Sequence, residues 1–257
     1  MKYLHWLAIC FALTGVFTRT SQAQSPPKSD WDEAKAREAA LAISKTWNLS
    51  EDFDANAAKN LQHEVYAVLP FDLPKTPRWI LLIATAPPDN NCHACAPVTG
   101  AVIFALKDGS WQSVYDQPHV TDLGTFGAPP SARVRSLGPA KPAIEFELGS
   151  MAQGYAGFSL TFVAEVNQKL RQVLSVATGE SNEAADMPPD KTFSWKATVE
   201  TSASIHEGFA DIIVKSSGTK ADENGENIRP YSESETYRFN GEVYKKVESE
   251  PTASKEP

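Results

Sequence analysis

Residues 143–148 read Ala-Ile-Glu-Phe-Glu-Leu, an alternation of apolar and charged side chains with a period of two. Successive side chains of a β-strand point to opposite faces, so this pattern predicts a strand with one buried face. The three larger apolar residues would share that face, and Glu145 and Glu147 would point outward. We therefore expect the two glutamates to be solvated rather than to form an acid–base pair.

Strands of similar character are predicted on both sides of this stretch. Residues 79–84 are a continuous apolar run, as in a buried strand. Further strands are expected at residues 65–69, 102–106, 158–166, 170–176, 193–200, 209–215, 236–239 and 243–247. Gly and Pro separate these segments, and no long helical pattern lies between them. This favours mainly antiparallel β-structure, as a sandwich, an open barrel or a twisted sheet, over a βαβ arrangement.

Two helices are predicted ahead of the strands, within residues 30–64. Asp30 is placed to cap the first helix, with Glu33 completing a capping box. One side of this helix is apolar and is expected to pack against the sheet: Trp31, Ala36, Ala40, Ile43 and Trp47. A second, shorter helix is expected at residues 54–64. The predicted fold class is therefore α+β, mainly antiparallel β with two N-terminal helices.

A hairpin pattern recurs three times along the chain. Residues 104–114, 162–173 and 237–247 each place an Asp-Gly, Asn-Gln or Asn-Gly pair between two strand-like segments, and each follows an apolar strand. The copies are unevenly spaced, which argues against a regular solenoid or propeller. Turn chemistry alone also produces such patterns, so the sequence leaves open whether the hairpin is a true duplication.

Two polar stretches interrupt the strand region. Residues 178–190 and 216–234 are expected to be long exposed connections, and an internal boundary, if there is one, would fall within 178–191. Otherwise we expect one globular domain over residues 30–248. It would follow a linker at 24–29 and precede a disordered tail at 249–257.

The first 23 residues have the features of a cleavable signal peptide. Lys2 supplies a positive charge, residues 4–17 are largely apolar, and Ser21-Gln22-Ala23 offers small residues at a cleavage site. The apolar run is shorter than the roughly 20 residues that a membrane-spanning helix needs. The sequence therefore predicts a periplasmic or secreted protein with no integral membrane segment after cleavage.

The chain is acidic. Its formal net charge is −8, which becomes −10 when Lys2 and Arg19 leave with the signal. No cluster of basic residues offsets this charge, which argues against binding to nucleic acid or to anionic membranes. A charged partner is expected to be cationic, such as an envelope or extracellular protein. The sequence does not define the oligomeric state.

The segment Cys92-His93-Ala94-Cys95 is the main candidate for chemistry. An even cysteine pair in an exported chain favours a structural disulfide. A thiol-redox site is a competing interpretation, but it needs a helix after the second cysteine, and the next residues alternate as in a strand. A metal site would need a distant histidine, with His119, His63 and His206 as candidates. Covalent haem attachment is excluded because Ala96 stands where the CxxCH motif requires histidine.

Sequence motifs of common enzymes are missing. The chain has no Gly-x-Ser-x-Gly, no His-Glu-x-x-His and no glycine-rich phosphate or dinucleotide motif. We therefore assign no catalytic residue and expect no cofactor and no bound metal. The predicted function is an exported non-enzymatic binding or inhibitory module. The alternatives are a thiol-redox or metal-binding protein using Cys92 and Cys95, and an accessory subunit of an envelope complex.

Overall fold

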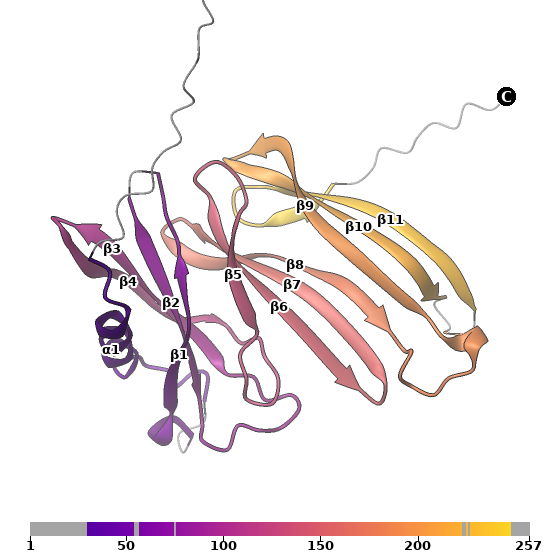
Figure 1. Cartoon of the computed structure of the whole chain (residues 1–257), viewed down its shortest axis with the longest axis horizontal. Coiled ribbons are helices and arrows are strands. Elements are labelled where there is room, and N and C mark those ends of the chain that lie inside the picture. Colours follow the sequence, from indigo (N-terminus) through magenta and orange to yellow (C-terminus); the bar gives the residue numbers. More distant parts are fainter. Residues whose placement is uncertain (1–29, 54–56, 75, 223–224, 226, 248–257) are drawn as a thin grey trace, which may run out of the picture.

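Antiparallel β-structure dominates the protein (Figure 1). The computed structural model describes residues 30–53, 57–74, 76–222, 225 and 227–247. The predicted signal peptide, linker and tail lie outside this part of the chain. Within it, the strands form one sheet of four and one sheet of eight, and strands that follow one another in sequence are neighbours in each sheet.

The four-stranded sheet has the order β1-β2-β3-β4, with β1 Gln62–Pro70, β2 Arg78–Ala86, β3 Val98–Lys107 and β4 Ser110–Thr121. The eight-stranded sheet runs in order from β5 to β12. Its strands are β5 Ser131–Ser136, β6 Pro142–Ala152, β7 Tyr155–Val166, β8 Lys169–Ser181, β9 Ser194–His206, β10 Phe209–Ala221, β11 Ile228–Phe239 and β12 Tyr244–Lys246.

The sheets stack as layers because most strands bury apolar side chains on at least one face. One face of β1–β4 is covered by the helix α1, Glu33–Ser44, and the other packs against β5–β8. The eight-stranded sheet also folds back on itself, so that β9–β12 pack against the other face of β5–β8. Only three residue pairs join β8 to β9, from Gly179 to Ser181, and the sheet bends there (Figure 1). The strands β5–β8 are therefore an internal layer.

The three predicted hairpins occupy equivalent places in these layers. Each is the last hairpin of a four-strand meander: β3–β4 with its turn at Asp108-Gly109, β7–β8 at Asn167-Gln168, and β11–β12 at Asn240-Gly241. The apolar strand predicted before each hairpin is β2, β6 or β10. The structure thus consists of three consecutive four-strand meanders, and the sequence pattern marks the same position in each.

The helix α1 packs its apolar side on the sheet as predicted, but its cap differs. Asp32, not Asp30, is the N-cap, and its carboxylate accepts a hydrogen bond of 3.1 Å from the backbone N–H of Lys35. Ala36 and Ala40 are buried against β1–β3. Two carboxylates stand close to the helix start, and periodicity alone does not decide which one caps it.

The prediction of a second N-terminal helix was wrong. Residues 57–60 form one 3-10 turn, η1 Ala57–Asn60, and β1 begins at Gln62. His63 and Glu64 pair with Thr85 and Ala84 of β2, so the end of the expected helix is strand instead. The segment's apolar residues are mostly alanines, which bury little area as a helix, whereas the strand completes the edge of a sheet. Residues 54–56 lie outside the described part of the chain.

A tryptophan cluster attaches the start of α1 to the sheet. The Trp31 ring stacks on Trp79 with centroids 5.1 Å apart and meets Trp111 edge-on at 5.0 Å. It also contacts Phe104 edge-on at 5.8 Å. These contacts place the helix on the side of the four-stranded sheet that faces away from the other layers (Figure 1).

Glu145 does not point to solvent as the alternation predicted. Its side chain is fully buried between β5–β8 and β9–β12. Arg133 donates from Nε to Oε1 of Glu145 at 2.9 Å, and Nη1 of Arg135 lies 3.0 Å from Oε2. The prediction failed because it assumed a sheet with one face exposed to solvent, whereas β6 lies in the internal layer. Glu147, two residues on, is exposed as expected.

The polar stretches predicted as connections are largely strand. Residues 216–234 form most of the β10–β11 hairpin, and β8 continues through Thr178 to Ser181. After β8 comes a loop with the short 3-10 turn η2, Pro189–Lys191. The long β10–β11 hairpin extends past the core with polar side chains on both faces, so hydropathy does not mark it as strand. Among the described residues, no helix has the length and apolar character required to cross a membrane.

Candidate functional site

The loop between β2 and β3 contains the disulfide. The sulfurs of Cys92 and Cys95 are bonded, and the two Cα atoms lie 4.9 Å apart, within the usual range for a bridge. The backbone N–H of Cys95 also donates to the carbonyl of Cys92 at 2.9 Å, which closes a tight turn. Cys92 is exposed, and Val98 begins β3 three residues after Cys95.

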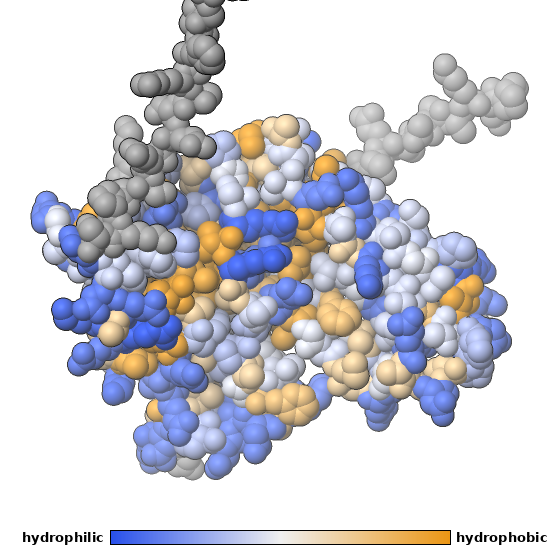
Figure 2. Space-filling model, in the orientation of Figure 1, coloured by the Kyte–Doolittle hydropathy of each residue, from blue (hydrophilic) through white to orange (hydrophobic). Residues whose placement is uncertain are grey.

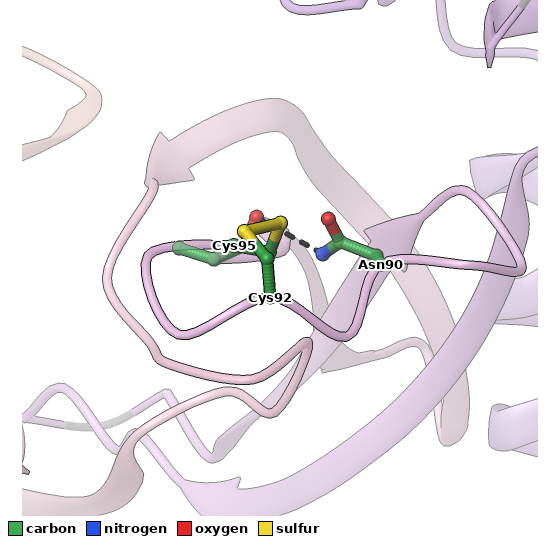
Figure 3. Close-up of a disulfide and its surroundings, with 4 residues drawn as sticks. Asn90, Cys92 and Cys95 are labelled. Carbon is green, nitrogen blue, oxygen red and sulfur yellow. Dashed lines mark hydrogen bonds between the residues drawn. A yellow bond between two sulfur atoms is a disulfide. The ribbon is translucent and has the colours of Figure 1, made fainter.

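Backbone contacts with a second loop fix the position of this turn. The N–H of Gly127, between β4 and β5, donates to the carbonyl of Cys95 at 2.7 Å. The amide nitrogen of Asn90 donates to the carbonyl of Ala96 at 3.3 Å, from inside the same loop (Figure 3). Gly127 has φ +73°, and a Cβ there would lie 1.9 Å from the carbonyl oxygen of Asn90, so only glycine permits this approach.

His93 joins a third segment, the β6–β7 hairpin, to the loop. Its ring meets Phe126 edge-on with centroids 4.9 Å apart, and its Nε2 lies 3.2 Å from the carbonyl oxygen of Met151. Phe126 is 58% exposed and Met151 is 62% exposed. Large apolar side chains held in the open by a braced backbone are typical of interaction surfaces. Figure 2 shows apolar surface at the lower edge of the molecule, below β5, with hydrophilic surface beside it.

We call the exposed group of His93, Phe126 and Met151 the rim. A cleft of about 950 Å³ lies beside it. One wall comes from the segment that runs from the end of α1 to the start of β1, and the other from the disulfide loop and the β4–β5 loop. Besides Phe126, prolines and amides make up much of the second wall: Pro87, Pro88, Asn90, Asn91, Pro97 and Pro129. Prolines fix their own φ, so a ligand finds this wall largely preformed.

The cleft carries one more positive than negative side chain. Lys45 and Lys59 line it together with Glu64 and His63. Burial lowers the pKa of His63, and the charge of Lys45 lowers it further, so the imidazole is neutral at pH 7. Its Nδ1 lies 3.1 Å from Oγ1 of Thr85. The cleft offers a ligand both polar and apolar contacts, with neutral amides among the polar groups.

The residues considered for metal binding lie apart. His119, on β4, pairs its Nδ1 with Oδ1 of Asp52 at 2.6 Å, and His206 lies 3.5 Å from Asp211. The sulfurs of Cys92 and Cys95 are bonded to each other, so neither is a thiolate ligand. In the described ranges, no three His, Cys, Asp or Glu side chains gather as a metal site would require. A strand follows Cys95, whereas a low-pKa redox thiol is usually placed at a helix N-terminus.

Sequence reasoning identified the disulfide loop but missed the partners that make it a rim. Phe126 and Met151 lie well over 20 residues from it in sequence and come next to it only through the layering of the sheets. A hint was present in the sequence, because Phe126 stands in a loop between glycines, where an aromatic side chain has no strand to pack on.

Comparison with known proteins gives no relative: no protein-family model, no curated protein and no solved structure matches the chain.

Proposed function

We propose that this protein is an exported, non-enzymatic binding module that holds a segment of a partner protein in the cleft beside the disulfide loop. The observation that carries the proposal is the rim itself. Phe126 and Met151 stay exposed while the backbone around them is braced by a disulfide and by hydrogen bonds from three separate segments. Exposed apolar groups on a prearranged backbone lower the entropic cost of binding.

The contact is expected to combine an apolar anchor with polar groups. Aromatic and methionine side chains are enriched at the centres of protein interfaces, where they fill pockets on the partner. Phe126 would serve as such an anchor, and the prolines of the second wall would form a firm apolar surface beside it. Asn90 and Asn91 offer amide groups to the partner's backbone.

Charge would act at longer range. The formal net charge, −8 for the whole chain and −10 after removal of the predicted signal peptide, favours approach of a cationic partner and would act chiefly on the rate of association. This fits the expectation of a cationic envelope or extracellular protein as partner. The lysines in the cleft oppose a cationic group at its centre, so the partner's positive charges would lie outside the cleft.

Site-specific photocross-linking in the producing cells tests the proposal. A photoreactive phenylalanine analogue replaces Phe126 in one variant and Ile205, which is 45% exposed on β9, in a matched control. The proposal predicts one discrete protein adduct from position 126 that does not form from position 205. No adduct at position 126, or the same adduct from both positions, would rule the proposal out.

A further inference from the structure

A second cavity lies where β9 separates from β8, between the two halves of the eight-stranded sheet. Its volume is about 340 Å³, and it shares no lining residue with the cleft beside the disulfide loop. Phe158 and Leu160 of β7, Trp195 of β9 and the β8 segment from Thr178 to Ser181 contribute to its walls. The size suits a ligand no larger than a disaccharide.

An aromatic ring forms an open platform in this cavity. Phe158 pairs across the sheet with Gly149 on one side and with Gly179 on the other, so neither directly paired residue has a side chain to cover its ring. A Cβ at either glycine would lie within 3.3 Å of a ring atom, so the ring rests against both neighbouring strands. It remains 47% exposed. Its position therefore depends on two glycines that leave its face accessible.

Four charged side chains, two positive and two negative, surround the platform. Arg133 and Lys196 are cationic, and Glu147 and Glu180 are anionic. Two of them are held in place: the buried Glu145 accepts from Nε of Arg133 at 2.9 Å, and Trp195 donates to Glu180 at 3.4 Å. A lining that is neutral overall does not favour a ligand of net charge. It does favour a neutral ligand that both donates and accepts hydrogen bonds.

We propose that this cavity binds a neutral sugar ring, as a monosaccharide or as the end unit of an oligosaccharide. The C–H bonds on one face of a pyranose would lie against the negative face of the Phe158 ring. Its hydroxyl groups would donate to Glu147 and Glu180 and accept from Arg133 and Lys196. This proposal does not rest on the protein-binding cleft, and failure of either leaves the other standing.

The test is a titration of the whole mature protein with maltotetraose, cellotetraose and the tetramer of N-acetylglucosamine. Binding is measured by saturation-transfer NMR and by calorimetry. Tetramers of galacturonic acid and of glucosamine serve as anionic and cationic probes. The proposal predicts saturable binding of at least one neutral tetramer, more tightly than either charged probe. Absence of saturable binding by all three neutral tetramers, or tighter binding of a charged one, overturns it.

Variants then test the platform. Phe158→Ala is expected to weaken binding of the neutral tetramer about tenfold, or ~1.4 kcal/mol, whereas Phe158→Trp keeps the ring and should keep the affinity. Ile205→Ala is the matched control, an exposed apolar side chain outside this cavity, and should bind as the wild type does. Thermal unfolding verifies that each variant is folded. A further variant, Glu147→Gln, leaves the ring in place and should weaken binding of the neutral tetramer severalfold. Unchanged affinity in both Phe158→Ala and Glu147→Gln contradicts the proposal.

Discussion

Nη1 of Arg135 on β5 lies 3.0 Å from the buried Oε2 of Glu145 on β6. The same guanidinium donates from Nη2 to the carbonyl of Val199 on β9 at 2.8 Å, so it ties the internal layer to the layer beyond it. Arg133 holds the other carboxylate oxygen of Glu145. Burying a carboxylate between two arginines has a desolvation cost. Removing the carboxylate alone costs more, because the arginines then lose their partner.

Removal of Glu145 should therefore destabilise the protein strongly. Glu145→Ala leaves the half-buried guanidinium of Arg135 without its carboxylate, whereas Arg133 is largely exposed, and the change is expected to cost about 3 kcal/mol. Glu147→Ala, on the same strand but exposed, should stay within about 0.5 kcal/mol of the wild type. Urea unfolding at neutral pH measures both. Similar small losses in the two variants would mean that Glu145 is solvated, as the sequence pattern alone suggested.

At Gly100 of β3, one added carbon atom would disrupt the packing. A Cβ there would lie 2.3 Å from the Trp47 ring and 2.6 Å from the carbonyl oxygen of Pro118. Gly100→Ala is therefore expected to lose about 2–3 kcal/mol through overpacking. Gly157→Ala is the control, because a Cβ at that strand glycine meets only Oγ of Ser150 at 3.7 Å. Equal stability of the two variants in chemical denaturation would show that Trp47 does not cover β3.

The N-cap of α1 should make the stability of the protein depend on pH. The hydrogen bond from the backbone of Lys35 lowers the pKa of Asp32, with a smaller contribution from the Lys35 side chain. A lowered pKa in the folded state means that this carboxylate stabilises the protein above its ordinary pKa. That contribution is lost as the pH falls through the lowered value. Asp32→Ala should thus unfold at a lower temperature than the wild type at neutral pH.

The difference between Asp32→Ala and the wild type should shrink as the pH falls below about 4, near the ordinary pKa of aspartate. Asp30→Ala is the control and should unfold at the wild-type temperature throughout. Calorimetric scans at several pH values measure this series. A larger effect of Asp30→Ala at neutral pH would place the cap at Asp30.

Local patterns predicted much of the fold. Alternation located the cores of β6 and β7, the continuous run at residues 79–84 is most of β2, and the Asp-Gly and Asn-Gly pairs form hairpin turns. These features depend on nearest neighbours along the chain, which the sequence displays directly. The apolar side of α1 was also predicted correctly, because helical spacing fixes which residues share a face.

Features that depend on long-range stacking were not predictable in this way. Whether Glu145 faces water depends on β9–β12 folding back over β6. The alternating pattern within β6 cannot show what covers that strand. The candidate cleft also depends on contacts between residues distant in sequence, because Phe126 meets His93 from a different loop. The polar β10–β11 hairpin escaped notice because its strands bury little beyond the core.

The disulfide should contribute modestly to stability. In the chain-entropy model, a closed loop this short stabilises the folded state by about 2 kcal/mol. Cys92→Ser with Cys95→Ser is therefore expected to remain folded at room temperature with a reduced unfolding free energy. Thiol titration of native protein that lacks the predicted signal peptide should find no free thiol before reduction and both afterwards. Two free thiols in protein purified without reductant would contradict a structural bridge.

The most direct test of the proposed binding site compares photocross-linking from position 126 in two backgrounds, the wild-type loop and the double serine variant. Our account holds that the bridge keeps Cys95 and its neighbours fixed against Gly127 and thereby prearranges the rim. It predicts that the adduct from position 126 forms in the wild-type background and falls severalfold in the double variant, although that variant is still folded. Equal adduct yield in the two backgrounds would contradict it.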